Sequence, residues 1–89
     1  MAYDQKTTVA FKKAQSHLNK VVEMVEKKEY CIDIMQQNLA VIGLLKSAHQ
    51  TLLEGHLGTC FKRAMATNNE KRQKEMIAEI LAVTKLFNK

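Results

Sequence analysis

Residues 31–66 read CIDIMQQNLAVIGLLKSAHQTLLEGHLGTCFKRAMA, and this stretch decides the fold. Its apolar residues recur every three or four positions from Met35 to Met65, which is the spacing of one face of an α-helix. No proline interrupts the pattern, and Gly55 and Gly58 lie inside it. We therefore predict one helix over about residues 31–66, with a length of about 54 Å.

Shorter periodic runs flank this stretch. Before it, the spacing of Phe11, Ala14, Leu18 and Val21 predicts a helix over about residues 4–27. After it, the sequence TNN at 67–69 supplies a turn and a capping residue, which predicts a helix over about residues 70–87. The link between the first two helices is short, so we expect an antiparallel hairpin. The expected fold is all-α: a single domain over residues 1–89, built as a three-helix subunit with one very long central helix.

The length of the central helix predicts association with other copies of the chain. A helix of about 54 Å is roughly twice the width expected of a domain of 89 residues. One subunit cannot cover the whole apolar stripe of such a helix. We therefore expect a homo-oligomer, a dimer or a larger assembly, built as a helical bundle.

The composition narrows the class of protein. The net charge of +5 suggests an anionic partner such as nucleic acid, although a lysine-rich surface is also an ordinary solvated one.

The first six residues are polar and lead into no apolar run, so we expect no signal peptide, no membrane span and a cytoplasmic location. In that reducing compartment the two cysteines are expected to be ligands or redox sensors. No oxyanion loop or substrate cleft is evident, so we expect no enzyme.

Three side chains that bind metals lie on one face of the long helix. At about 100° per residue, His56 and Cys60 each fall within about 20° of Cys31, and the two are neighbours because they are four residues apart. Cys31 and His56 are still about 37 Å apart along the axis, so one chain cannot close a site with them. If two copies pack antiparallel about an axis near Gly43 and Leu44, Cys31 of one copy meets His56 and Cys60 of the other. Two thiolates and one imidazole favour Cu(I), with Zn²⁺ as the second choice.

Other interpretations of these residues stay open. Cys31 and Cys60 are also compatible with small buried apolar residues, and His56 with a hydrogen-bonded interface residue. Two facing thiols would also permit a sulfur sensor, in which Cys31 and Cys60 become persulfidated or crosslinked. We interpret His49 as structural and His17 as a surface or hydrogen-bonding residue.

Two segments resemble the signatures of a known family. The stretches YCIDIMQQ at 30–37 and HLGTCF at 56–61 are similar to the two signatures of the copper-sensing repressors of the CsoR and RcnR type. The resemblance extends from about Phe11 to the C-terminus. It implies an antiparallel dimer that forms a four-helix bundle, and a tetramer made of two dimers. It also implies a Cu(I)-responsive transcriptional repressor, whose apo form binds operator DNA and is released by Cu(I).

The resemblance also assigns supporting residues to the metal site. A tyrosine that lies beside the ligands in the family falls on Tyr30. A glutamate of the third helix falls on Glu75, with Glu79 as the alternative. A hydrogen bond from such a group to the ligating histidine fixes its tautomer and can couple the metal to the third helix.

The first helix departs from the family pattern. The positions where the family usually carries DNA-binding arginines hold Ala10 and Gln15, and Ser16 replaces the glycine that usually follows. Four lysines remain that can meet phosphates as point charges, without the planar fork of arginine: Lys6, Lys12, Lys13 and Lys20. Besides the sulfur sensor, two functions therefore stay open: a Cu(I)-responsive repressor, and a cytosolic Cu(I)-binding homologue without operator binding.

Overall fold

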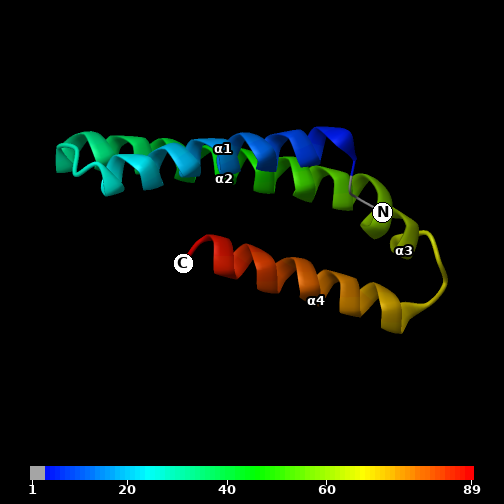
Figure 1. The fold of residues 1–89 in the computed structure, drawn as a ribbon. Helices are drawn as coiled ribbons and strands as arrows, with labels where there is room; N and C mark the ends of the chain where they lie inside the picture. The colour runs from blue at the N-terminus through cyan, green and yellow to red at the C-terminus, as the bar shows by residue number, and fades with distance from the viewer. Residues whose placement is uncertain (1–3) are drawn as a thin grey trace.

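The computed structural model describes residues 4–89, and those residues confirm the expected all-α fold of three helical segments without strands. Helix α1 (Gln5–Glu26) and helix α2 (Cys31–His56) form the antiparallel hairpin that the short link predicts (Figure 1). Helix α2 continues through η1 (Leu57–Phe61) and α3 (Lys62–Met65). The chain then folds back as α4 (Glu70–Phe87), which runs beneath the hairpin in Figure 1.

Polar side chains cap the first turns of α1 and α4, whereas α2 begins after Tyr30 without a side-chain cap. The Asp4 carboxylate accepts hydrogen bonds from the backbone N–H and the hydroxyl of Thr7, both at 2.9 Å, and starts α1. The Asn69 side chain accepts the backbone N–H of Arg72 at 3.1 Å and starts α4, which confirms the predicted capping residue. Because each cap satisfies a backbone donor that has no partner within its helix, the helices begin at these residues.

The link between α1 and α2 closes with a Schellman motif. The backbone N–H of Glu29 bonds the carbonyl of Met24 at 3.0 Å, and that of Lys28 bonds the carbonyl of Val25 at 3.0 Å. Lys28 adopts a φ of 56°, in the left-handed region that glycine usually occupies at this position. The turn therefore forms with a strained lysine, and the chain reverses direction within residues 27–30.

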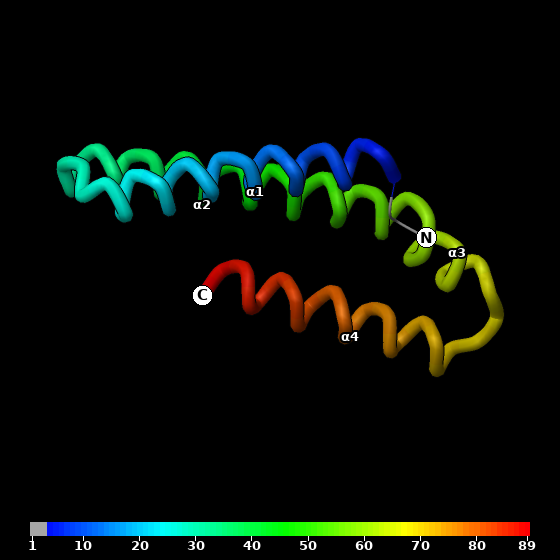
Figure 2. Tube along the Cα trace, in the orientation of Figure 1, coloured from blue at the N-terminus to red at the C-terminus, as the bar shows by residue number. Residues whose placement is uncertain are grey.

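The central helix differs from the expected regular α-helix in one turn. Residues 57–61 form a π-helical turn, in which backbone N–H groups bond the carbonyl five residues before them instead of four. Gly55 and Gly58 weaken the α-helix around this turn, and the Thr59 hydroxyl bonds the Gly55 carbonyl at 2.6 Å. The helix bends here, as the tube in Figure 2 shows between α2 and α3.

The core is thin for a chain of this size. Among residues 4–89, the buried apolar side chains are Ala14, Val21, Met24, Val41, Ala48, Ala64 and Met76. The radius of gyration is 17.4 Å, whereas a compact domain of this length would have about 12 Å. The accessible surface is 7056 Å², whereas a folded monomer of this mass exposes about 5,300 Å². A single chain therefore leaves much apolar surface uncovered.

Candidate metal centre

The three predicted ligands lie at or just beyond the two ends of helix α2. Cys31 is the first residue of α2, and its thiol is free and exposed. His56 is the last residue of α2, and Cys60 lies in the η1 turn; both are half-buried. The His56 ring lies 6.5 Å from the ring of Phe61, at a tilt of 58°. A thiol therefore lies at one end of α2, and an imidazole with a second thiol lies at the other end.

One chain does not bring these residues together. Within residues 4–89, no group of three His, Cys, Asp or Glu side chains lies close enough to hold one metal ion. The rise of the helix separates Cys31 from His56 by about 37 Å. A site that uses Cys31 together with His56 and Cys60 therefore needs two chains.

The π turn changes the geometry expected for His56 and Cys60. In an α-helix, residues four apart are neighbours on one face, whereas a π turn inserts one extra residue. The Thr59 hydroxyl lies 3.7 Å from the sulfur of Cys60 and 2.6 Å from the carbonyl oxygen of Gly55. Apolar periodicity did not indicate a role for Thr59. The sequence does contain a signal, because Thr59 follows Gly55 and Gly58 and directly precedes the candidate ligand Cys60.

The residues expected to support the metal site are exposed in the single chain. Tyr30 is 67 % exposed and precedes α2 without a side-chain cap. Both candidate glutamates, Glu75 and Glu79, pair with Arg72, at 3.4 and 3.5 Å respectively. These pairs are half-exposed, so each stabilises α4 only slightly. The single chain does not distinguish Glu75 from Glu79.

The two remaining histidines make contacts of the structural kind expected for them. Nε2 of His17 in α1 lies 2.8 Å from Oε1 of Gln37 in α2, in a hydrogen bond that joins the two helices. The ring of His49 stacks on that of Phe87, with the centroids 4.8 Å apart. Each histidine thus fixes one element of the fold against α2.

The four lysines predicted to contact DNA are all exposed. Lys6, Lys13 and Lys20 are seven residues apart and lie within about 40° of one another around α1, whereas Lys12 lies on another side. Lys6 and Lys13 line a shallow hollow of about 480 Å³ between α1 and α2, together with the hydroxyl residues Ser47 and Thr51. Ala10 lies in the same hollow, and none of its lining residues is acidic. Sequence patterns did not indicate Ser47 or Thr51, because only the packing of α2 on α1 brings them beside the lysines.

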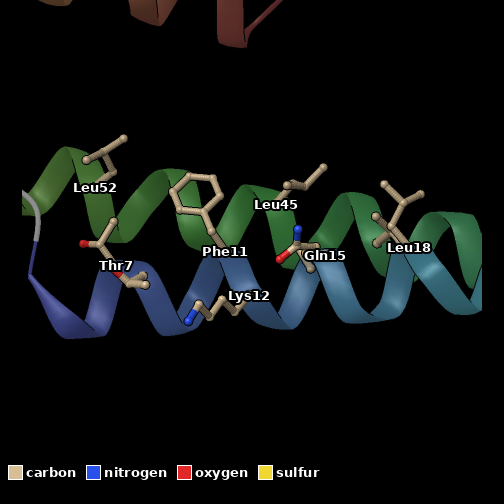
Figure 3. A pocket seen from close by; sticks show the side chains of 10 residues that line it. Thr7, Phe11, Lys12, Gln15, Leu18, Leu45 and Leu52 are labelled. Atoms are coloured by element: carbon tan, nitrogen blue, oxygen red, sulfur yellow. The ribbon is translucent and has the colours of Figure 1, made fainter.

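A second, apolar groove lies between the same two helices. It has a volume of about 650 Å³, and Figure 3 shows Phe11 and Leu18 of α1 beside Leu45 and Leu52 of α2. Lys12 borders this groove and not the basic hollow. Lys20 lies farther along α1, beside a third hollow that also contains carboxylates. The hairpin therefore presents an apolar groove, a basic hollow and a hollow of mixed charge.

Comparison with known proteins identifies the family. The model of the family described as metal-sensitive transcriptional repressor matches residues 3–86. The chain belongs to this family. Its members are repressors and not enzymes, as expected from the sequence. Within residues 4–89, no helix combines the length and apolarity needed to cross a membrane.

Curated relatives of this chain are named copper-sensing transcriptional repressors. CsoR of Mycobacterium ulcerans is 41 % identical over 54 residues, which cover 61 % of this chain and 46 % of the relative. CsoR of Mycobacterium tuberculosis is 33 % identical over 73 residues, which cover 82 % of this chain and 61 % of the relative. CsoR of Bacillus subtilis is 32 % identical over 82 residues, which cover 92 % of this chain and 78 % of the relative. The chain thus spans about half to three fifths of the length of the mycobacterial CsoR proteins. No solved structure matches it.

Proposed function

We propose that this protein is a Cu(I)-responsive transcriptional repressor whose metal site forms between two chains. Cys31 of one subunit would bind the ion together with His56 and Cys60 of another. The observation that carries this proposal is the placement of three metal-binding side chains on one helical rod, too far apart for a single chain to use. The copper-sensing relatives support the choice of metal.

The donor set fits Cu(I). Both cysteines are free, and the exposed position of Cys31 leaves its thiol accessible to a second chain. Two thiolates and one imidazole, without a carboxylate, suit a soft ion better than Mg²⁺ or Ca²⁺, which prefer oxygen. When bound, Cu(I) supplies a soft centre that links the two chains. Tyr30 and either Glu75 or Glu79 would orient the ligating imidazole by hydrogen bonding.

The surface that one chain leaves exposed supports an oligomer. One chain exposes about 1,700 Å² more than a compact monomer, so two chains that covered this excess would bury about 3,400 Å² in total, within the range of obligate homodimers. Ile42 and Leu45 are 40 % and 44 % exposed, and both lie within about 40° of Cys31 around the α2 axis. We propose that this face pairs antiparallel with a second copy in a four-helix bundle, and that two dimers form the tetramer.

The basic hollow supports operator binding. Lys6 and Lys13 provide positive charge, and Ser47 and Thr51 provide hydroxyl donors for phosphate oxygens. Around the α2 axis, Ser47 and Thr51 lie within about 20° of the side opposite Cys31. The hollow therefore stays open when two chains pair through the cysteine face. We propose that the apo form binds DNA there, inside the cytoplasm, and that Cu(I) binding releases it.

A second candidate function follows from the replaced arginines. Because Ala10 and Gln15 hold positions where the family usually carries arginine, the chain could bind Cu(I) without recognising an operator. A sulfur sensor that uses Cys31 and Cys60 is a third, but it would have no need for His56. These functions differ in whether DNA binding exists and in whether copper changes it.

A mobility shift assay with the DNA upstream of the coding sequence separates these functions. It is run first with the apo protein and then with one Cu(I) per subunit, without oxygen. The proposal predicts that the wild-type protein gives a shift that copper abolishes. The Cys60→Ser variant should give a shift that persists when copper is added. Absence of any shift, with copper still bound by the three ligands, would contradict the repressor and favour the copper-binding homologue.

The two neighbouring lysines provide a matched test of the DNA surface. Lys13→Gln should reduce the slope of log affinity against log salt by about one, because it removes one phosphate contact. Lys12→Gln removes the same charge beside the apolar groove and should leave the slope unchanged. An equal loss in both variants would show that the hollow is not the contact surface.

A further inference from the structure

Met35 follows Cys31 by one helical turn, on the same face of α2. The two residues are four positions apart, which places them within about 40° of each other around the helix axis. Helix α2 is a regular α-helix from Cys31 to His56, so residues four apart are neighbours along its surface. A long side chain in an α-helix leans towards the helix N-terminus. Met35 can therefore reach the surroundings of Cys31 with its thioether.

Met35 does not belong to the core of its own chain. It is 57 % exposed, although methionine is an apolar residue. The two buried residues of α2 are Val41 and Ala48, and they lie about 120° and 140° away from Met35 around the axis. Packing within one chain therefore does not account for this methionine. Its sulfur is accessible from outside, as the thiol of Cys31 is.

The chain near Cys31 offers sulfur to a metal ion on this face, and no oxygen. Among residues 32–37, Asp33 lies about 160° from Cys31 and Gln36 about 140°, so both face away. A thioether is a neutral, soft donor that suits Cu(I). Zn²⁺ is usually bound by thiolate, imidazole and carboxylate instead. The surroundings of Cys31 therefore favour Cu(I) over Zn²⁺.

We propose that Met35 supplies its thioether as an additional ligand to the Cu(I) ion bound by Cys31. This inference rests on the proposed site between two chains. Each chain then contributes a pair of donors four residues apart: Cys31 with Met35 from one chain, and His56 with Cys60 from the other. Because a thioether has no acidic proton, this role does not depend on ionisation of Met35.

The antiparallel pairing proposed above agrees with this role. About an axis near Gly43 and Leu44, Met35 of one chain lies opposite about residue 53 of the other, within one turn of His56. The pairing thus brings Met35 to the end of the partner helix that carries the imidazole. A leucine at position 35 would fill similar space there but would bring no donor atom.

Selenium absorption spectroscopy tests the bond directly. The methionines are replaced by selenomethionine, and the protein is loaded with one Cu(I) per subunit without oxygen. We expect the selenium edge to show copper bonded to selenium in the wild type. Met35→Leu keeps the apolar bulk and should abolish this signal. Met65→Leu removes a half-buried methionine of α3 and should retain it, which makes it the matched control.

Metal affinities separate a ligand from a residue that only packs between chains. Competition with chelators gives the affinities for Cu(I) and, in a separate experiment, for Zn²⁺. Met35→Leu should bind Cu(I) about 10-fold more weakly, a loss typical of a supporting group at a metal site, and should bind Zn²⁺ as the wild type does. Unchanged affinities, or equal losses for both metals, would overturn the ligand role.

The outcomes distinguish this inference from the proposed function. A wild-type protein that binds no Cu(I) overturns the proposed function, and the role of Met35 with it. If the wild type binds Cu(I) but shows no copper bonded to selenium, only the role of Met35 is overturned. A selenium–copper signal that persists in Met35→Leu would also overturn it, because the ligand would then be another methionine.

Discussion

Phe87, at the end of α4, stacks on His49 in the middle of α2, with ring centroids 4.8 Å apart and ring planes only 9° from parallel. This contact joins the C-terminal end of α4 to the hairpin, while Gln73 near its N-terminal end donates to the Thr67 carbonyl, in the link before α4, at 2.6 Å. Met76 is the one buried residue of α4. The stacking of Phe87 on His49 is therefore an important contact for holding α4 against the hairpin.

We predict that Phe87→Ala loosens the C-terminal half of α4. The loss of an aromatic pair should cost about 1 kcal/mol in local stability, in addition to the apolar contact area. Hydrogen exchange of the α4 amides measures this loss directly. Leu86→Ala is the control, because Leu86 is 69 % exposed and should change exchange little. Equal acceleration in both variants would show that the stack does not hold the helix.

Lys28→Gly should stabilise the protein. Lys28 has a φ of 56°, where a side chain is strained by about 1 kcal/mol and glycine is not. Urea unfolding should therefore show a gain of that order. Lys28→Ala keeps a Cβ and should show no gain, so a similar gain in both variants would point to the lost charge instead of the backbone.

The start of α1 should loosen in acid. The hydrogen bonds from the backbone and side chain of Thr7 hold the pKa of the Asp4 carboxyl below its ordinary value. The stabilisation is therefore present above the unfolded pKa of Asp4 and is lost as the pH falls through its lower folded pKa. Exchange of the Thr7 amide should accelerate over that range, beyond the intrinsic change with pH. Asp4→Asn keeps a good cap without a titrating group and should remove this dependence.

Ile42→Glu should break the proposed oligomer. Ile42 is 40 % exposed and lies about 20° from Cys31 around the helix axis, so pairing through this face would bury an unpaired carboxylate. Light scattering should show a smaller assembly. Ser47→Glu places the same charge on the opposite side of α2 and should leave the mass unchanged. An unchanged mass for Ile42→Glu would contradict pairing through the cysteine face.

The sequence was sufficient to predict the helices because apolar spacing and capping residues are local signals. The start of α4 after Asn69 and the hairpin of α1 and α2 both follow from such signals. The π turn could not be predicted in this way, because the periodic pattern tolerates one inserted residue. Gly55, Gly58 and Thr59 lie at this turn, and the hydrogen bond from the Thr59 hydroxyl to the Gly55 carbonyl is a relation that a helical wheel does not contain.

The candidate site could be predicted only in part, for a related reason. The chemistry of Cys31, His56 and Cys60 is evident from residue types and spacing, and the helix rise excludes a site within one chain. The partners of Lys13 in the basic hollow depend instead on how α2 packs against α1. Ser47 reaches that hollow from 34 positions away in the sequence, a relation that no local pattern records.

Complementation between two inactive variants tests the shared metal site most directly. Cys31→Ser and Cys60→Ser chains are each expected to lack complete sites as homo-oligomers. In a mixed antiparallel pair, Cys31 from the second chain and His56 with Cys60 from the first form one intact site. Tight Cu(I) binding should therefore return when the two variants are refolded together, with one site for each mixed pair. If the mixture binds no more copper than the separate variants, the two-chain site is contradicted.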